Sequence, residues 1–341
     1  MRGAKFNIYC LSSKAYRIIF KNEIKPPRPE KVCAECIAGD TMSAQNHIDT
    51  RAGAQTAPLR IGSEEHKQAF CRMFLDTFDP YKPAIIAWPA LEPDAFKRLT
   101  SLPIWDLAVQ TEGKAALRMK YYAETLADPL VKEAIALNGF EEQRHKDVLH
   151  HMVAFYGIKL EPEPPYRRWH GPEQGFMRTG FGECVDSFFA FGLFALAKRS
   201  GFFPPVLVET FEPVIQEECR HILFFNNWVK WHLRNLPPLR RAAFLVWCVR
   251  VFIDIARDRL GTAKDVGGGD NFTAKGHEEL GADIDPRELL EVCLAENDRR
   301  MARYDSRLPR PKLVPRLVKI ALFFMPRSKR AGKGETAGER A

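Results

Sequence analysis

Apolar and polar residues alternate with helical spacing along most of the chain after residue 63. In residues 64–79, the side chains of Phe70, Met73, Phe74 and Phe78 share one side, which predicts an amphipathic helix. Three prolines then interrupt the pattern within residues 80–89, so we expect an extended connector before the next helix.

Four longer segments predict the helices of a bundle, at residues 102–126, 129–156, 181–198 and 206–233. Asp128 and Pro129 mark the start of the second helix, with Asp as the N-cap and Pro in the first turn. Gly201 and two following prolines mark the turn before the fourth helix. Residues 157–180 contain four prolines and are predicted to be a long connection without regular structure. We therefore predict an all-α fold of two helical hairpins joined by a long crossover.

Further helices are expected after the bundle. Residues 240–260 are strongly apolar but too short and too charged to span a bilayer, so we expect this helix to pack on the bundle. Residues 261–279 form a predicted glycine-containing loop without the sequence context of a phosphate site, and nucleotide binding is not expected. Asp285 starts a last predicted helix that ends near residue 304. No run of eighteen apolar residues occurs, so no membrane-spanning helix is expected.

The first 63 residues lack sustained periodicity and are predicted to be a flexible arm. They contain no signal-peptide pattern, and Met42 is an alternative start of the protein. Cys33 and Cys36 form a lone Cys-x-x-Cys, which supplies too few ligands for a structural zinc site. We thus expect a flexible arm, a bundle with a leading helix, further packing helices and a basic amphipathic tail, at residues 1–63, 64–235, 236–304 and 305–341.

Positive charge is concentrated at the end of the chain. The formal net charge is +8, and residues 299–341 hold thirteen Lys or Arg against three Asp or Glu, so the rest of the chain is close to neutral. Residues 313–325 are apolar except for Arg316 and Lys319. Such a segment can lie on an anionic membrane surface or dock on the protein, and both interpretations stay open. Nucleic-acid binding is not expected, because no recognition motif accompanies the charge.

The eight cysteines are scattered along the chain. Cys184, Cys219 and Cys248 fall in apolar helical segments, which indicates buried free thiols rather than a disulfide framework. Without an export signal, the expected location is the cytoplasm, including the inner face of the membrane if the tail binds lipid.

The strongest chemical signal is a five-residue pattern, Glu-Glu-x-Arg-His, which occurs at residues 141–145 and 217–221. Residues three apart lie on one face of an α-helix, so Glu142 and His145 can direct a carboxylate and an imidazole at one ion. Glu218 and His221 repeat this arrangement. Each copy is therefore half of a predicted metal site.

The first Glu and the Arg of each copy are predicted to lie on a different face of the helix from the second Glu and the His. Glu141 stands three residues from Arg144, and it lies about 100° around the helix from the inner Glu of its copy. Glu217 and Arg220 repeat this spacing. We interpret them as intrahelical ion pairs on an outer, charged flank.

A single Glu-x-x-His can arise by chance on a solvated helix face. These two are the only copies among nine histidines, and apolar residues stand seven positions on either side of each inner Glu. A carboxylate within an apolar stripe is costly unless it is paired or bound to a metal. The metal interpretation is therefore favoured.

Two further carboxylates are expected from two more helices, because a pair of metal ions needs additional ligands for bridging and neutralisation. Glu112 precedes Glu142 by thirty residues, and Glu183 precedes Glu218 by thirty-five. Asp186, one turn after Glu183, is the alternative ligand on its helix. Each half thus repeats a hairpin of one Glu helix and one Glu-x-x-His helix.

These residues resemble the ligand pattern of the ferritin-like di-iron carboxylate superfamily, which includes rubrerythrins, bacterioferritins and O2-activating oxidases and hydroxylases. The resemblance covers roughly residues 100–235. It implies a ferritin-like four-helix bundle that holds two iron ions, with manganese left open at either position. The implied ligands are Glu112, Glu142, His145, Glu183, Glu218 and His221. The two-hairpin spacing and the tail are also similar to the quinone-precursor hydroxylase branch, although no motif identifies the substrate.

The resemblance implies an O2-dependent oxidase or monooxygenase whose electron donor the sequence does not identify. We expect a hydrophobic small-molecule substrate, because nearby phenylalanines would line an apolar chamber unless they only fill the core. These are Phe188, Phe189, Phe191, Phe194, Phe202, Phe203, Phe224 and Phe225. Two alternatives stay open: an iron-binding or ferroxidase protein without an organic substrate, and a partner-binding module with a structural metal.

Overall fold

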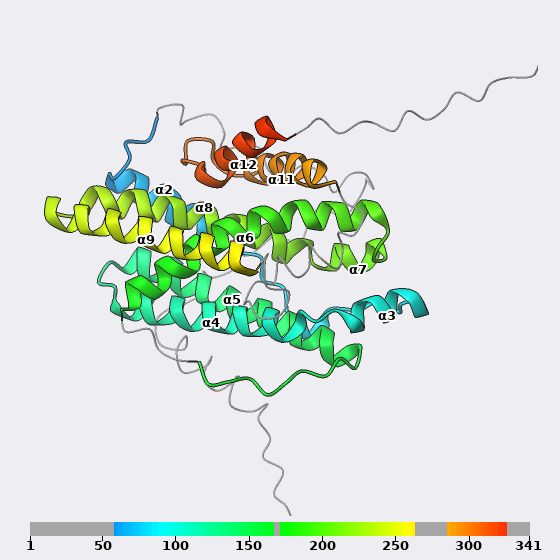
Figure 1. Cartoon of the computed structure of the whole chain (residues 1–341). Coiled ribbons are helices and arrows are strands. Elements are labelled where there is room, and N and C mark those ends of the chain that lie inside the picture. The colour runs from blue at the N-terminus through cyan, green and yellow to red at the C-terminus, as the bar shows by residue number, and fades with distance from the viewer. Residues whose placement is uncertain (1–57, 167–170, 263–284, 326–341) are drawn as a thin grey trace, which may run out of the picture. The chain divides into compact units, whose positions relative to one another are not determined.

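Helices make up all the regular structure in the residues that the computed structural model describes, which are 58–166, 171–262 and 285–325 (Figure 1). The predicted all-α class is confirmed for this part of the chain. The elements are α2 (Glu64–Asp76), η1 (Pro83–Ile85), α3 (Pro93–Ser101), α4 (Trp105–Thr125), α5 (Pro129–Phe155), α6 (Pro172–Ser200), α7 (Pro205–Thr210), α8 (Glu212–Asn235), α9 (Pro238–Thr262), α11 (Pro286–Met301) and α12 (Leu313–Phe324). Most of the predicted arm with Cys33 and Cys36, the glycine-containing loop after residue 262 and the end of the tail lie outside the described residues.

Capping side chains and prolines determine where many of these helices begin. Asp128 accepts hydrogen bonds from the backbone N–H groups of Leu130 and Val131 at 3.0 and 3.1 Å, at the predicted start of α5. Asp285 and Ser63 cap α11 and α2 in the same way. A proline stands at the first or second position of α3, α5, α6, α7, α8 and α11, where its missing N–H leaves no intrahelical partner unsatisfied.

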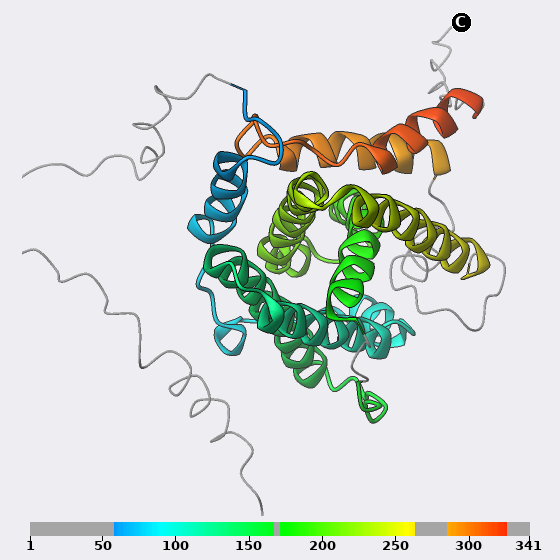
Figure 2. The same cartoon turned by 90° about the vertical axis from the view of Figure 1, so that its left-hand side faces the viewer.

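Four long helices form two hairpins. α4 packs along α5, α6 packs along α8, and α4 also packs against α6. Figure 2 shows these four helices nearly end-on, with α2 beside α5 and α8. The chain between α5 and α6 crosses from one hairpin to the other, and α4, α5, α6 and α8 carry the residues that the sequence analysis selected.

The predicted crossover at residues 157–180 is too long, because α6 begins at Pro172. Its first turns belong to the core, where Phe176 is buried among other aromatic rings. Gly180 allows close packing of α6 on α8, since a Cβ at this position would overlap the ring of Phe225. The glycines and proline that suggested a loop instead start a helix and permit a tight helix contact.

The predicted helix at residues 206–233 is two helices. α7 ends at Thr210 and α8 begins at Glu212, with Phe211 between them. Pro213 lacks a backbone N–H and its ring clashes with the preceding turn, so the helix cannot continue through it. The predicted extended connector before α4 also contains two short helices, η1 and α3, that the apolar pattern did not indicate.

The helices after the bundle pack on α6. α9 lies against α6 and α8 through one face, which buries Phe244 and Val251, so the expected packing applies to this face only. On its other face, Val246, Val249 and Ile253 are exposed. α11 packs along α6, and α12 packs on α11.

α6 is the one helix in the described ranges that is long and apolar enough to cross a membrane by length and composition. A core helix passes the same test, and α6 packs against α4, α8, α9 and α11. We therefore treat α6 as a core helix.

The contact between α6 and α11 depends on Gly192, where a Cβ would lie 2.3 Å from Sγ and 3.0 Å from the backbone nitrogen of Cys293. We predict that Gly192→Ala lowers the free energy of unfolding by about 1–2 kcal/mol, because overpacking outweighs the gain in helix propensity. Gly182→Ala on the same helix is the control. No atom lies within 4 Å of its added Cβ, so stability should rise by up to about 1 kcal/mol. Urea unfolding followed by circular dichroism measures both, and an unchanged or more stable Gly192→Ala protein contradicts the contact.

Candidate metal centre

The structure brings together the six side chains that the sequence analysis selected as metal ligands. They are Glu112 on α4, Glu142 and His145 on α5, Glu183 on α6, and Glu218 and His221 on α8. Their ligand atoms form two groups in which all atoms lie within 4.8 Å of one another: Glu112, Glu142, His145 and Glu218, and secondly Glu142, Glu183 and His221. Glu142 belongs to both groups. Each group can hold a metal ion.

The centre of this cluster is shielded from solvent. His145 and His221 are 1% and 0% exposed, and Glu142 is 2% exposed. The two imidazole rings lie nearly parallel, with centroids 5.5 Å apart. Ionisable side chains buried this deeply require paired or ion-bound partners.

Several polar atoms of the cluster have no hydrogen-bond partner. They are Nδ1 of both histidines, Oε1 of Glu142 and both carboxylate oxygens of Glu183. Nδ1 of His221 lies 2.9 Å from Oε1 of Glu142, and Nδ1 of His145 lies 3.1 Å from Oε1 of Glu218, but neither contact has hydrogen-bond alignment. Buried polar atoms are normally satisfied, so nitrogen and oxygen atoms that converge without hydrogen bonds fit a set of metal ligands.

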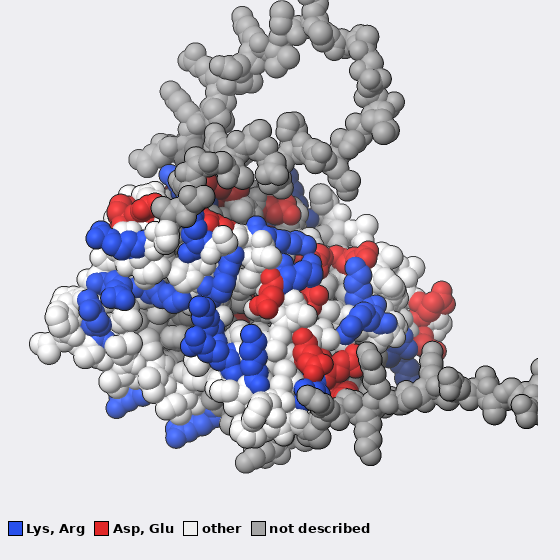
Figure 3. All heavy atoms as spheres, turned by 90° about the horizontal axis from the view of Figure 1, so that it is seen from above, with Lys and Arg blue, Asp and Glu red and all other residues white. Residues whose placement is uncertain are grey.

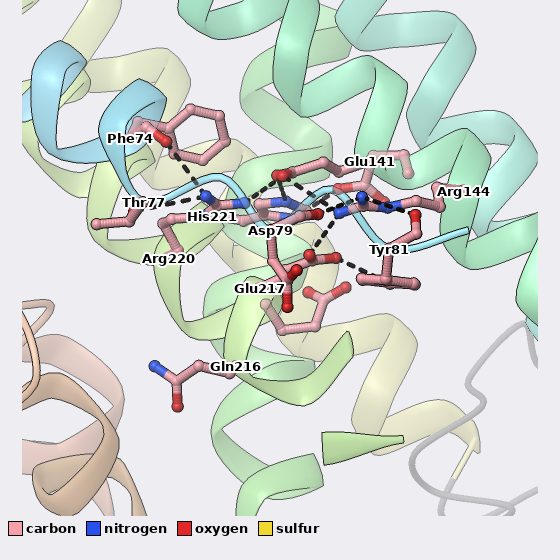
Figure 4. A network of polar contacts seen from close by, with 12 residues as sticks. Phe74, Thr77, Asp79, Tyr81, Glu141, Arg144, Gln216, Glu217, Arg220 and His221 are labelled. Atoms are coloured by element: carbon pink, nitrogen blue, oxygen red, sulfur yellow. Dashed lines mark hydrogen bonds and ion pairs between the residues drawn. The ribbon is translucent and has the colours of Figure 1, made fainter. Parts of the chain in front are cut away.

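Glu141 and Glu217 do not lie on an outer flank, so this part of the sequence interpretation is wrong. Both are buried, and each contacts the histidine of the opposite helix. Figure 4 shows Glu141 beside His221. Nε2 of His221 donates to Glu141 at 2.9 Å, and Nε2 of His145 donates to Glu217 at 2.8 Å. Such carboxylate contacts hold metal-binding imidazoles in one orientation, here with Nδ1 directed at the cluster.

Arg144 and Arg220 complete a crossed set of ion pairs between α5 and α8. Arg144 donates to Glu217 at 2.5 Å, and Arg220 donates to Glu141 (Figure 4). The predicted pair within α5, Arg144 with Glu141, is present only as a longer contact of 3.5 Å. The helix faces that carry these residues are directed at each other and not at solvent. Each buried carboxylate therefore pairs with an arginine of the opposite helix.

The connector after α2 closes the outer side of the cluster. Arg144 donates to the backbone carbonyls of Asp79 and Tyr81 at 2.5 and 3.4 Å, and its guanidinium lies 3.9 Å from the centroid of the Tyr81 ring. The Tyr81 hydroxyl donates to Glu217 at 3.1 Å, and burial raises the pKa of Tyr81. Tyr81 therefore remains a hydrogen-bond donor at neutral pH.

Burial and mutual repulsion favour protonation of two carboxylates in the metal-free cluster. Burial raises the pKa of Glu112 to about 8, and burial together with the charges of Glu142 and Glu218 holds the pKa of Glu183 well above its usual range. The pKa of His145 is also raised, because surrounding carboxylates outweigh the opposing effect of burial. A bound cation would displace these protons.

A cavity of about 550 Å³ adjoins the cluster and is lined mostly by apolar side chains. Phe194 and Phe203 line it, as predicted. Phe188, Phe191 and Phe224 are instead buried in the helix-packing cores, where the alternative interpretation placed them. An apolar chamber is thus present, with fewer phenylalanines than the sequence suggested.

The remaining candidates lie outside the two ligand groups. Asp186 lines the cavity but belongs to neither group, which favours Glu183 as the ligand on α6. His150 is largely exposed and pairs with Glu163, while His151 accepts from the indole N–H of Trp88. Neither histidine belongs to a ligand group.

Comparisons of the chain with protein-family models, with curated proteins and with solved structures gave no match. The interpretation of the site therefore rests on its own residues and their geometry.

Sequence reasoning missed the contacts around the ligands. Glu141 and Glu217 support the histidines, Tyr81 supports Glu217, and the Ser187 hydroxyl donates to Glu218 at 3.1 Å. A signal for the two carboxylates was present, because both copies of the five-residue pattern retain the outer Glu and the Arg. A solvated flank does not need identical residues in both copies. Tyr81 and Ser187 had no comparable signal.

We predict that Glu141→Gln and Glu217→Gln each weaken metal affinity by about 10–100-fold, because they remove the charge that orients and polarises the imidazole. Competition with a chromophoric chelator for Mn(II) or Co(II) measures the affinity. Glu133→Gln, at an exposed position on α5, is the matched control and should change it less than twofold. Unfolding of the metal-free variants detects any loss of stability from the unpaired arginine. Unchanged metal affinity in a folded Glu217→Gln protein would contradict the proposed role of Glu217 in orienting His145.

Proposed function

We propose that this chain is a ferritin-like di-iron protein that uses O2 to oxidise a hydrophobic small molecule. The observation that carries the proposal is the position of Glu142, whose carboxylate belongs to two ligand groups beside one largely apolar cavity. Two adjacent ions need such a shared carboxylate as a bridge. One Glu from each of two helices and one Glu-x-x-His from each of two others is the ligand arrangement of di-iron and di-manganese carboxylate bundles.

Charge balance supports two ions rather than one. Four ionised carboxylates, Glu112, Glu142, Glu183 and Glu218, carry a total charge of −4 when both histidines are neutral. Two divalent cations neutralise this charge, whereas one leaves uncompensated negative charge in a buried site. The ligand set therefore fits a dinuclear centre.

Mixed carboxylate and imidazole ligands favour iron or manganese over ions that prefer only oxygen or sulfur. We propose iron because an apolar cavity next to the ligands suits O2 and an organic substrate. Manganese uses the same ligands, and the metal content of protein from its native host distinguishes the two.

Bound iron ions would supply the electrons and the Lewis acidity that O2 chemistry requires. The side chains of the chain have other tasks. Glu142 and Glu218 would hold the ions, while Glu141 and Glu217 fix the imidazoles. The apolar walls bind the body of the substrate and exclude water from the oxidising site.

Anaerobic loading with Fe(II) should give two iron ions per chain, and one pulse of O2 should then oxidise an added lipophilic compound. Two Fe(II) ions supply the two electrons that reduce one oxygen atom of O2 to water while the other enters the product, so one product per chain is the upper limit. Iron analysis and mass spectrometry measure both quantities. Ferric iron beyond two per chain without product indicates the ferroxidase alternative, and stable binding without oxidation indicates a structural metal.

The ligand assignment is tested by variants in the same experiment. Glu142→Ala and Glu218→Ala should each lose bound iron, because each removes a carboxylate that no neighbour replaces. Asp186→Asn is the control on α6 and should retain two iron ions, whereas Glu183→Gln should not. Retention of two iron ions by Glu142→Ala would refute the shared ligand.

A further inference from the structure

The cavity beside the cluster is elongated along α4. Trp105, Glu112 and Arg118 line it in this order. With a rise of about 1.5 Å per residue, the Cα of Glu112 is separated along the helix axis by about 10 Å from that of Trp105 and by about 9 Å from that of Arg118. The ligand cluster therefore lies between the two ends of one cavity.

α6 lines the same cavity in the opposite order. Arg178 precedes Glu183, and Phe194 follows it. Figure 1 shows α4 and α6 running in opposite directions, and Nη1 of Arg118 donates to the Thr179 hydroxyl at 3.1 Å. Both helices thus place basic side chains at one end and apolar side chains at the other.

The basic end is formed by Lys114, Arg118 and Arg178. Once metal ions balance the four Glu ligands, Asp186 is the remaining acidic side chain of the lining, so positive charge is in excess. A guanidinium has five N–H donors, so Arg118 can bind an anion while it contacts Thr179. Burial and the nearby charge of Arg178 lower the pKa of Arg118, and an anion here would offset this repulsion.

The basic end also reaches a second hollow under the crossover. Lys114 and Arg118 line this hollow, of about 220 Å³, together with Pro164, Pro165 and Tyr166. The two cations therefore border both hollows, at the end of the cavity opposite to its apolar end.

The opposite end offers apolar surface. Leu99, Ile104 and Leu207 are buried there, at 2%, 4% and 3% exposure. The indole N–H of Trp105 donates to the backbone carbonyl of Leu99 at 2.9 Å, so it presents only its ring to the cavity. A hydrocarbon chain fits this end, because burial of each CH2 group is favourable.

We propose that the cavity binds an amphiphilic anion with an elongated apolar body and a carboxylate or phosphate head. The head contacts Arg118 and Arg178, and the body passes the ligand cluster toward Trp105. This inference names the substrate class of the proposed oxidation. It places the reacting atom along the apolar body of the substrate, at a distance from the head set by the spacing of Arg118 and Glu112.

The test compares dodecanoate, dodecyl phosphate, dodecanol and dodecyltrimethylammonium with the full-length, iron-loaded protein. Displacement of a fluorescent fatty-acid probe without O2 measures affinity below the micellar concentrations. At least one of the two anions should bind about tenfold more tightly than the alcohol, because its head forms charge-assisted hydrogen bonds. The tighter anion identifies the head group, and the cation should bind most weakly. Equal affinity for all four compounds overturns the inference.

A double variant, Arg118→Gln with Arg178→Gln, should reduce the preference for the anion over the alcohol to less than about threefold while dodecanol affinity stays unchanged. Lys120→Gln, at an exposed position on α4, is the control. Circular dichroism and iron content show whether the double variant is folded, and a folded variant with full preference also overturns the inference. Binding is measured without turnover, so the two proposals can fail separately. A protein that oxidises other lipophiles but does not prefer the anion over the alcohol contradicts this inference and leaves the proposed function intact.

An independent observation concerns the outer face of α12. Val314 and Val318 are buried against α6 and α11. On the other side, Leu317, Ile320 and Phe324 are 47%, 55% and 78% exposed. These three positions follow helical spacing, so they form one apolar stripe directed away from the protein.

Positive charge accompanies this stripe. Lys312, Arg316 and Lys319 are exposed on α12 and follow their own helical spacing beside it. Figure 3 shows the face that carries α11 and α12, where basic side chains gather beside uncharged surface. Arg287 of α11 donates to the backbone carbonyl of Leu322 at 2.9 Å, which holds α12 in this orientation.

We infer that this face of α12 binds an anionic lipid surface. Its apolar stripe would enter the boundary between headgroups and acyl chains, and its cations would pair with lipid phosphates. Docking on the protein, the other possibility that the sequence left open, accounts for Val314 and Val318 but leaves the exposed stripe without a partner.

Flotation with vesicles tests this inference. Full-length protein should float with vesicles that contain phosphatidylglycerol and remain behind with pure phosphatidylcholine. Leu317→Glu with Phe324→Glu should abolish flotation, while Ile85→Glu, at a site 77% exposed on η1, should not. Equal flotation of the α12 variant contradicts lipid binding. If the protein instead forms a dimer without vesicles and the same variant prevents this dimer, the stripe is an interface with a second copy of the chain.

Discussion

The site depends on a crossed set of ion pairs and hydrogen bonds between α5 and α8. Glu141 accepts hydrogen bonds from His221 and Arg220 of the opposite helix, and Glu217 accepts them from His145 and Arg144. Removing one member would leave an unpaired charge in the interior, at a cost of about 3–5 kcal/mol. α5 packs far more extensively on α4 than on α8, so these side chains set the register between the two Glu-x-x-His helices.

These crossed contacts also close one side of the cluster, while its other side faces the cavity. Arginines, Tyr81 and the connector after α2 surround the outer carboxylates, which leaves the imidazole Nδ1 atoms directed inward. On the opposite side, Glu112 and Glu183 line the cavity between α4 and α6. In the function that we propose, the substrate approaches the cluster through this cavity, and the polarity of its two ends selects which molecules bind. The residues that orient the two histidines are thus spatially separate from those that form the ends of the cavity.

The repeated five-residue pattern selected four of the six clustered side chains, because spacing on a single helix determines which residues share a face. Glu112 and Glu183 came from the repeat of the whole hairpin. The pattern did not reveal the environment of Glu141 and Glu217, which depends on how two helices turn toward each other. The start of α6 was missed for a related reason. Gly180 looks like a loop residue in the sequence, and its role against Phe225 exists only once α8 is in place. Local periodicity predicts elements, whereas contacts between elements decide the meaning of ambiguous residues.

The basic end of the cavity and the stripe on α12 are both consistent with one physical property of the substrate that we propose. A molecule with an extended apolar body is scarce in water, because each exposed CH2 costs about 0.8 kcal/mol, and it accumulates in membranes. A protein that binds the membrane surface meets such a molecule at high local concentration. Inside the cavity, apolar contacts alone would let the hydrocarbon chain of the bound molecule slide, since such contacts are non-directional. In the binding mode that we propose, charge-assisted contacts of the head with Arg118 and Arg178 would remove this freedom, and the distance from these arginines to the ligand cluster would then select the atom that reacts.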